Sequence, residues 1–111
     1  MCGINFDCMP CIYWSNKAKI SYLQRLVIVH SIIYYELNES VITDKRYDSI
    51  SYQLLNLCKE DNQAFKQSDY YYVMHDFDAN TGFDIISRLT ESDKSYLLHI
   101  ASNVLRLNKG K

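Results

Sequence analysis

Tyrosines and aspartates are concentrated between residues 34 and 48, where their types and spacing suit the binding of a flat, positively charged ring. Aromatic faces attract a cation by about 0.5–2 kcal/mol, depending on how far the cation is desolvated. Carboxylates add Coulomb attraction and accept hydrogen bonds from an amide or from sugar hydroxyls. Among small molecules, the oxidised nicotinamide ring with its carboxamide and ribose matches these groups best. The candidate ligand-binding residues are Tyr34, Tyr35, Asp44, Tyr47 and Asp48.

The spacing predicts that two helices and a turn bring these residues together. Asp44, Tyr47 and Asp48 stand at positions i, i+3 and i+4, and they therefore share one face of a helix. Tyr34 and Tyr35 end the preceding helix, so the five side chains converge if the two helices pack antiparallel. In the alternative interpretation, Tyr34 and Tyr47 belong to the core and Asp44 is only a favourable charge at a helix start.

The first of these helices is predicted to begin after a cap at Ser15 or Asn16 and to end near Leu37. Its apolar residues recur at three- and four-residue spacing, and they are frequent enough to predict a central helix. His30 lies within this stripe, where we expect a hydrogen-bonded core or boundary histidine rather than a metal ligand. The stripe consists of Leu23, Leu26, Val27, His30, Ile33, Tyr34 and Leu37.

The second helix is predicted to start after an N-cap at Thr43 and to end near Lys59. Asp44 then lies in its first turn, where negative charge is favoured by the helix dipole. Residues 60–68 are polar and predict a loop or a frayed helical turn. The inner face of the second helix consists of Tyr47, Ile50, Leu54, Leu55 and Cys58.

The aromatic residues of 69–77 are typical of a strand, but the all-α context favours a short helix capped by Ser68. A second short helix is predicted over residues 83–89, followed by a last helix. Thr90 and Asp93 resemble a capping box at the start of that helix. We therefore predict an all-α fold, a compact bundle of four to five helices. Residues 1–14 form an N-terminal arm and residues 15–111 a single helical domain. The buried stripe of the last helix is predicted to be Leu97, Ile100, Val104 and Leu107.

Two segments resemble metal sites but lack part of the required ligand set. Cys8 and Cys11 form a C-x-x-C pair, but a zinc site needs a second pair, which only Cys2, Cys58 or a histidine could supply. Residues 76–84 carry acidic or amide side chains at alternate positions. They lack the glycine at the sixth and the glutamate at the twelfth position of a calcium-binding EF-hand loop. No metal or required cofactor is predicted.

Charge and hydropathy exclude several classes of partner. The net charge is −1, from 12 basic and 13 acidic residues, so no long-range field attracts nucleic acid. The first residues lack the basic start and apolar run of a signal peptide. The longest apolar run, residues 26–29, is too short to cross a bilayer. We expect a cytoplasmic protein with no membrane or nucleic-acid partner, whose cysteines are thiols.

The corner between the two helices resembles the N-terminal Ia domain of bacterial NAD-dependent DNA ligases, over roughly residues 20–60. Those domains carry an aromatic pair, a turn, a hydrophobic residue, a capping residue and Asp-x-x-Tyr-Asp. Here these are Tyr34-Tyr35, Ile42, Thr43 and residues 44–48. In the family, this domain grips the nicotinamide mononucleotide (NMN) half of NAD. The resemblance implies that Tyr34 and Tyr35 stack on or flank the ring, that Asp44 and Asp48 bond the carboxamide or ribose, and that Tyr47 closes the other side.

This sequence departs from the ligase pattern in ways that bear on activity. Asn38 stands where the family usually has aspartate and Ser40 where it usually has proline, and the catalytic Lys-x-Asp-Gly motif is absent. The chain therefore cannot seal DNA by itself, and we do not expect an enzyme. NAD or NMN hydrolysis at Asp44 or Asp48 is a weaker alternative.

Two functions remain open from the sequence. The first is a non-catalytic module that recognises NMN, NAD or a protein that handles NAD, and its basis is the pattern of tyrosines and aspartates in residues 34–48. The resemblance implies a phage-encoded protein, since stand-alone relatives of this domain occur among small phage and prophage proteins. The second is a phage-encoded inhibitor that binds a host protein, for example a host enzyme or an antiphage defence system such as CRISPR–Cas. Its basis is the small size and the surplus of tyrosines, which suit protein interfaces. These include Tyr70, Tyr71 and Tyr72.

Overall fold

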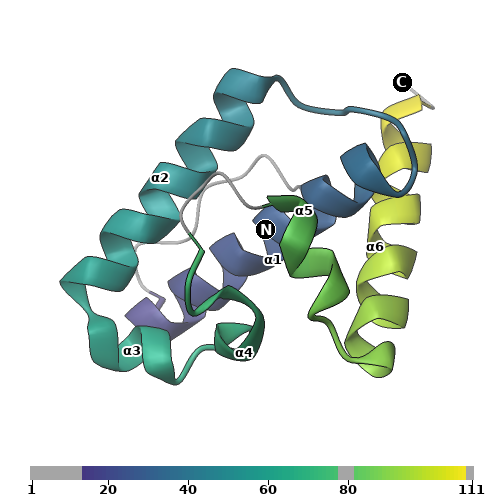
Figure 1. Cartoon of the computed structure of the whole chain (residues 1–111). Helices are drawn as coiled ribbons and strands as arrows, with labels where there is room; N and C mark the ends of the chain where they lie inside the picture. Colours follow the sequence, from purple (N-terminus) through teal and green to yellow (C-terminus); the bar gives the residue numbers. More distant parts are fainter. Residues whose placement is uncertain (1–13, 78–81, 110–111) are drawn as a thin grey trace.

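The chain folds into helices joined by short loops, as a computed structural model that describes residues 14–77 and 82–109 shows (Figure 1). No strand occurs among these residues, which confirms the all-α prediction. The Cys8–Cys11 pair and the centre of the 76–84 segment lie outside the described residues. The helices are α1 (Asn16–Tyr35), α2 (Asp44–Glu60), α3 (Asn62–Lys66), α4 (Tyr71–Met74), α5 (Gly82–Ser87) and α6 (Glu91–Lys109).

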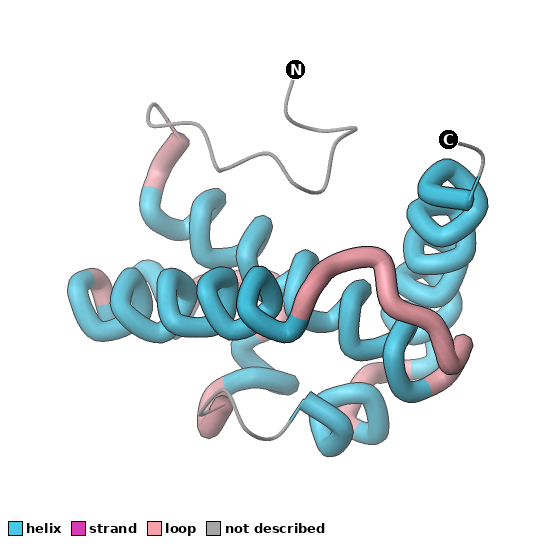
Figure 2. The backbone as a smooth tube through the Cα atoms, turned by 90° about the horizontal axis from the view of Figure 1, so that it is seen from above, coloured by secondary structure: helices cyan, strands magenta, loops and turns pink. Residues whose placement is uncertain are grey.

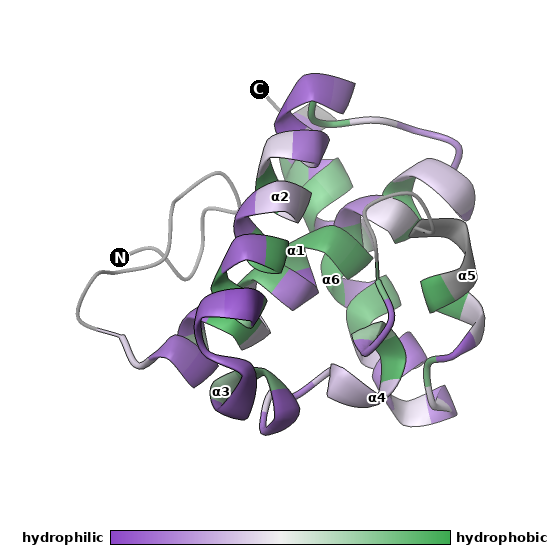
Figure 3. Cartoon of the chain, turned by 60° about the vertical axis from the view of Figure 1, so that its left-hand side comes forward, coloured by the Kyte–Doolittle hydropathy of each residue, from purple (hydrophilic) through white to green (hydrophobic). Residues whose placement is uncertain are grey.

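Helix α1 is the centre of the packing, as its apolar pattern predicts. Between Ile20 and Ile33 every residue is buried except Arg25, which is half-buried. Helices α2, α3, α5 and α6 all contact α1. Figure 3 shows the hydrophobic residues gathered in the middle of the molecule, on α1 and on the sides of other helices that face it. Burial on all sides explains why apolar residues are not confined to one narrow stripe of this helix.

Helices α1 and α2 form a V that opens toward the loop connecting them (Figure 1). At the closed end, the Asn16 side-chain amide donates a hydrogen bond of 2.9 Å to the Asp61 carboxylate. Further along, the hydroxyl groups of Ser31 and Tyr47 lie 2.9 Å apart and share a hydrogen bond. The loop of residues 36–43 spans the open end and is the long pink segment in Figure 2. Because the two helices diverge, the space between them at the open end is filled by side chains and by the loop.

The sequence determines both ends of that loop. Helix α1 ends at Tyr35, two residues before the predicted end, because the chain reverses at Asn38, which has φ of 54°. Asparagine tolerates this left-handed conformation better than most residues. The Glu39 N–H then donates to the Ile33 carbonyl at 3.0 Å. At the other end, the Arg46 N–H donates to the Thr43 hydroxyl at 3.1 Å, which confirms the predicted N-cap.

The polar segment directly after α2 contains a helix that its composition does not predict. Helix α3 forms where a loop or frayed turn was expected, because the Asp61 carboxylate accepts the Ala64 N–H at 3.1 Å and Ala64 is buried. The fold therefore has six helices in its described part, one above the predicted range. Helix α4 is a single turn, which realises the predicted 69–77 helix only in part.

A buried glutamine fixes the start of α4 to α1. Gln24 is fully buried, and its side-chain nitrogen donates to the Ser68 hydroxyl at 2.9 Å. Its side-chain oxygen accepts the Tyr70 N–H at 3.1 Å. A buried amide with both ends bonded fixes the position of the segment that it contacts.

Helix α6 closes the other side of α1. Thr90 caps it, since the Asp93 N–H donates to the Thr90 hydroxyl at 3.2 Å, as predicted. Leu97 and Ala101 are fully buried, but Leu107 is 63% exposed. The predicted stripe is therefore wrong at Leu107, because the last turns of α6 extend beyond the core. Within the described ranges, no helix is long and apolar enough to span a membrane.

Candidate functional site

A pocket of about 190 Å³ lies at the open end of the V, between the last turns of α1, the connecting loop and the first turn of α2. An engineered cavity of roughly 150 Å³ accommodates benzene. The pocket is therefore large enough for one six-membered ring and too small to enclose a dinucleotide. Its walls are formed by His30, Ser31, Tyr34 and Tyr35 from α1, residues 40–43 from the loop, and Asp44 and Tyr47 from α2.

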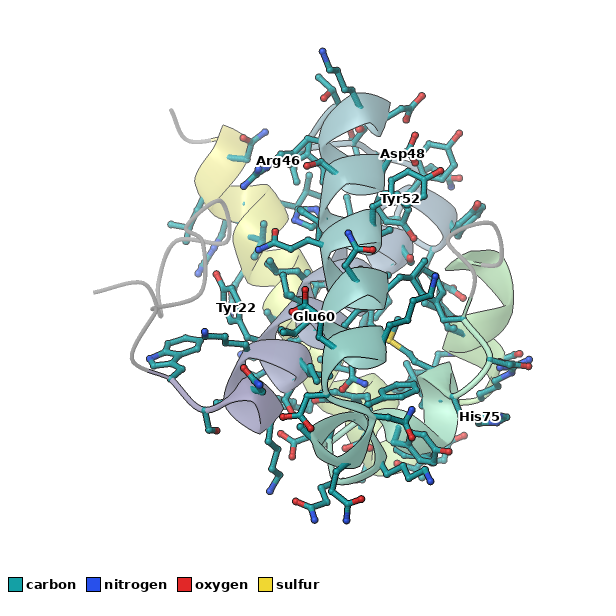
Figure 4. All side chains as sticks on the ribbon, turned by 90° about the vertical axis from the view of Figure 1, so that its left-hand side faces the viewer. Tyr22, Arg46, Asp48, Tyr52, Glu60 and His75 are labelled. Carbon is teal, nitrogen blue, oxygen red and sulfur yellow. The ribbon has the colours of Figure 1, made fainter. Side chains whose placement is uncertain are left out.

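Four of the five predicted site residues line this pocket: Tyr34, Tyr35, Asp44 and Tyr47. Asp48 does not line it. Successive residues turn by about 100° around a helix, so Asp48 points well away from the direction of Tyr47. Figure 4 shows Asp48 on the same side of α2 as Tyr52, with Arg46 on the opposite side. Two aspartates were predicted to converge at the site, but only Asp44 lines the pocket.

Tyr34 and Tyr35 stand at the mouth of the pocket and are 56% and 47% exposed. They are not core residues, contrary to the alternative interpretation for Tyr34. Their ring centroids lie 4.9 Å apart with an angle of 82° between the planes. In this edge-to-face contact the two rings do not form a parallel pair. A ligand ring can therefore stack on the face of one tyrosine and meet the other at its edge, but cannot lie sandwiched between them.

Tyr47 forms the opposite wall and is half-buried. Its hydroxyl is bonded to Ser31, which is buried in α1. Burial raises the pKa of the Tyr47 phenol above 10.0, the Ser31 hydrogen bond opposes this rise, and the charges of Tyr35 and Asp48 add to it. The phenol is therefore neutral at physiological pH. Tyr47 offers its ring to the pocket, while its hydroxyl holds the two helices at a fixed separation.

The charge around the pocket is negative. Asp44 is the only Asp, Glu, Lys or Arg among the described residues that line it. A wider surface hollow of about 490 Å³ adjoins the pocket and shares Tyr34, Tyr35 and Ser40 with it. Asn38 and Glu39 complete the described lining of this hollow. An aromatic, negatively charged cleft without lysine or arginine suits a cation.

A larger and more open hollow of about 620 Å³ lies at the other end of α1. Trp14 and Tyr22 line it, with ring centroids 5.4 Å apart, together with Lys17, Arg25 and Asp69. None of the predicted site residues contributes to it. Its mixed charges show no preference for one class of ligand.

Sequence analysis did not assign His30 and Ser31 to the site. His30 was expected in the core or at its boundary, and the structure places it in the buried wall of the pocket. Their spacing carries a usable signal, because Ser31 precedes Tyr34 by three residues and Tyr35 by four. Residues at these spacings lie on one helix face. The face that carries the two tyrosines therefore continues into the pocket one turn earlier.

Comparisons of the chain with protein families, with curated proteins and with solved structures found no match. Among residues 14–77 and 82–109, no group of three or more His, Cys, Asp or Glu side chains is arranged to hold a metal ion.

Proposed function

We propose that this protein is a non-catalytic module that recognises pyridine nucleotides, NMN or NAD, through the pocket between α1 and α2. The observation that carries the proposal is a ring-sized pocket with tyrosines on two sides and a carboxylate at its edge. The resemblance of residues 34–48 to the ligase Ia domain supports the same ligand class. A protein that handles NAD is a partner consistent with this role.

Each part of the ligand has a suitable counterpart in the walls. The pyridinium ring carries a positive charge, which favours contact with the faces of Tyr34, Tyr35 and Tyr47. The carboxamide N–H groups and ribose hydroxyls are donors that Asp44 can accept. The pocket encloses little more than the ring, so most of the nucleotide stays in solvent. We therefore expect a dissociation constant of about 0.1–1 mM.

The test uses two exposed tyrosines as a matched pair. Tyr34 lines the pocket, whereas Tyr52 on α2 is 61% exposed and does not. NMN and NAD are titrated into the full chain, with binding followed by calorimetry and by NMR shifts of the pocket residues. Tyr34→Ala should weaken binding about fivefold or more, through loss of one ring contact. Tyr52→Ala should bind as the unmodified chain does.

The proposal fails if neither ligand gives heat or shifts at millimolar concentration. It also fails if Tyr34→Ala and Tyr52→Ala have the same effect, since binding would then not depend on the pocket.

A second candidate function is supported by the exposed tyrosines. Tyrosine is enriched among the residues that dominate binding energy at protein interfaces. Among the residues whose exposure the structure describes, five tyrosines on α1, α2, α4 and α6 are between 40% and 61% exposed: Tyr34, Tyr35, Tyr52, Tyr72 and Tyr96. Of the three consecutive tyrosines at 70–72, Tyr70 is buried and Tyr71 half-buried, so only Tyr72 is well placed for a partner. These residues support the proposal of an inhibitor that binds a host protein.

The same two variants separate the two functions. A host protein retained at 1:1 stoichiometry by Tyr34→Ala and lost with Tyr52→Ala would support the inhibitor. A partner lost only with Tyr34→Ala would place that interaction at the nucleotide pocket.

A further inference from the structure

The pocket and the hollow beside it adjoin, because Tyr34, Tyr35 and Ser40 line both. A ligand whose ring enters the pocket can therefore place its next group over this hollow. In a pyridine nucleotide that group is the ribose, followed by the 5′-phosphate. The charges along the surface therefore decide whether a phosphate is tolerated.

The described residues that line the pocket and the hollow include two carboxylates, Asp44 and Glu39, and no lysine or arginine. Glu36, which caps α1, is a further exposed carboxylate at the beginning of the same loop. Lys45 and Arg46 follow in α2 but line neither the pocket nor the hollow, and Figure 4 places Arg46 on the side of α2 opposite to Asp48.

The end of α1 adds to this negative field. The carboxyl end of a helix carries a partial negative charge that a basic residue in the last turn commonly offsets. The last turn of α1 has no basic residue. At the start of α2 the opposite partial charge is already balanced by Asp44 in the first turn. The partial charge at the end of α1 thus favours a cation at the pocket. The partial positive charge at the start of α2 is offset by Asp44 and does not attract an anion.

A phosphate monoester carries about −1.5 to −2 charges at pH 7 and is normally bound by lysine, arginine or several N–H groups. Building on the proposed function, we infer that the site prefers cationic, N-substituted nicotinamide compounds that carry no phosphate, such as nicotinamide riboside, over NMN and NAD. The ring charge is favoured by the tyrosines and Asp44. The ribose hydroxyls meet Asn38, Glu39 and Ser40, which accept or donate hydrogen bonds.

The test compares four probes on the full chain: nicotinamide, 1-methylnicotinamide, nicotinamide riboside and NMN. Nicotinamide and 1-methylnicotinamide differ by the ring charge, and the riboside and NMN differ by the phosphate. At about 20 mM salt the riboside should bind about tenfold more tightly than NMN, and the ratio should fall at about 500 mM salt as charges are screened. 1-Methylnicotinamide should bind more tightly than nicotinamide.

Variants then locate the source of the preference. Glu39→Gln keeps the shape of the side chain and removes its charge, so the ratio of the riboside and NMN affinities should fall about threefold. Glu60→Gln, at the far end of α2 (Figure 4), is the matched control and should leave the ratio unchanged. Asp44→Asn is a second test of charge, and thermal melts confirm that each variant is folded.

The outcomes separate this inference from the proposed function. NMN binding as tightly as the riboside, or more tightly, overturns the inference and leaves pyridine-nucleotide recognition standing. The inference is also overturned if nicotinamide matches 1-methylnicotinamide, or if neither Glu39→Gln nor Asp44→Asn changes the ratio. If none of the probes binds, the proposed function itself is lost.

Discussion

The hydroxyl of Tyr47 on α2 and the hydroxyl of Ser31 on α1 lie 2.9 Å apart. This hydrogen bond joins the two helices near the open end of the V. Ser31 is 1% exposed, so its oxygen has little access to water. The bond therefore contributes to stability and also determines the width of the pocket that Tyr47 lines.

We expect Tyr47→Phe to lower the free energy of unfolding by about 1–2 kcal/mol, because the buried Ser31 hydroxyl loses its partner. Urea denaturation measures this change. Tyr52→Phe is the control and should have no effect, since Tyr52 is 61% exposed. A double-mutant cycle with Ser31→Ala should give a coupling of about 0.5–1.5 kcal/mol. Additive effects would mean that the two hydroxyls do not interact in solution.

Removal of the charge at Asp44 should weaken the binding of 1-methylnicotinamide about fivefold, because a carboxylate at the pocket wall attracts the cationic ring. Asp48→Asn is a matched control, one turn further along α2, and should change the affinity less than twofold. NMR titration of both variants measures the difference. Equal losses would show that Asp48 also contributes, as the resemblance to the ligase domain implies.

Gln24→Leu should destabilise the fold strongly. The substitution removes both bonds of a fully buried side chain and leaves the Ser68 hydroxyl and the Tyr70 N–H without that partner. We expect a loss of about 2–4 kcal/mol in the free energy of unfolding. Gln63→Leu on the exposed side of α3 is the control and should change stability by less than about 0.5 kcal/mol. A small effect of Gln24→Leu would show that α4 does not depend on this amide.

Stability should decrease at alkaline pH. Burial raises the pKa of the Cys58 thiol from 9.0 to about 11. Because the folded state holds this proton more tightly than the unfolded state, the contribution to stability is complete below pH 9.0 and disappears as the pH rises through about 11. Burial raises the pKa of the Tyr47, Tyr70 and Tyr72 phenols above 10.0 as well, which adds to the loss above pH 10.0.

Urea denaturation between pH 8 and 11 measures this effect. The loss assigned to Cys58 is about 1–3 kcal/mol over that range. Cys58→Ala should be less stable than the unmodified chain at neutral pH, but its stability should begin to fall at higher pH. Parallel profiles for the two proteins would exclude the thiol as the source.

Local sequence rules predicted the parts of the fold that depend on neighbouring residues. Thr43 and Thr90 were predicted as caps, and each accepts a backbone N–H of its helix. The central position of α1 followed from the frequency of its apolar residues. In contrast, α3 depends on Asp61, which bonds both Ala64 and the distant Asn16. A tertiary contact of this kind leaves no periodic signal in the sequence.

The pocket was predictable in its residue types but not in its geometry. The tyrosines and Asp44 meet because two helices with a short connection pack against each other, as expected. The direction of Asp48 follows from the turn of about 100° per residue along α2, whereas the positions of the loop residues 40–43 depend on the angle at which α2 crosses α1. The sequence does not specify that angle, because it results from the packing of α2, whose Ile50 and Leu54 are buried, against α1 and from the turn at Asn38.

Because α1 is the centre of the packing, the pocket between α1 and α2 depends on the whole fold. A peptide covering residues 34–48 would retain every residue predicted to bind the ligand. It would lack the surrounding helices that hold α1 and α2 in position. Transferring the pocket to another protein would therefore require the helices that surround α1 as well. A shortened chain that preserves the pocket would therefore have to be nearly as long as the protein itself.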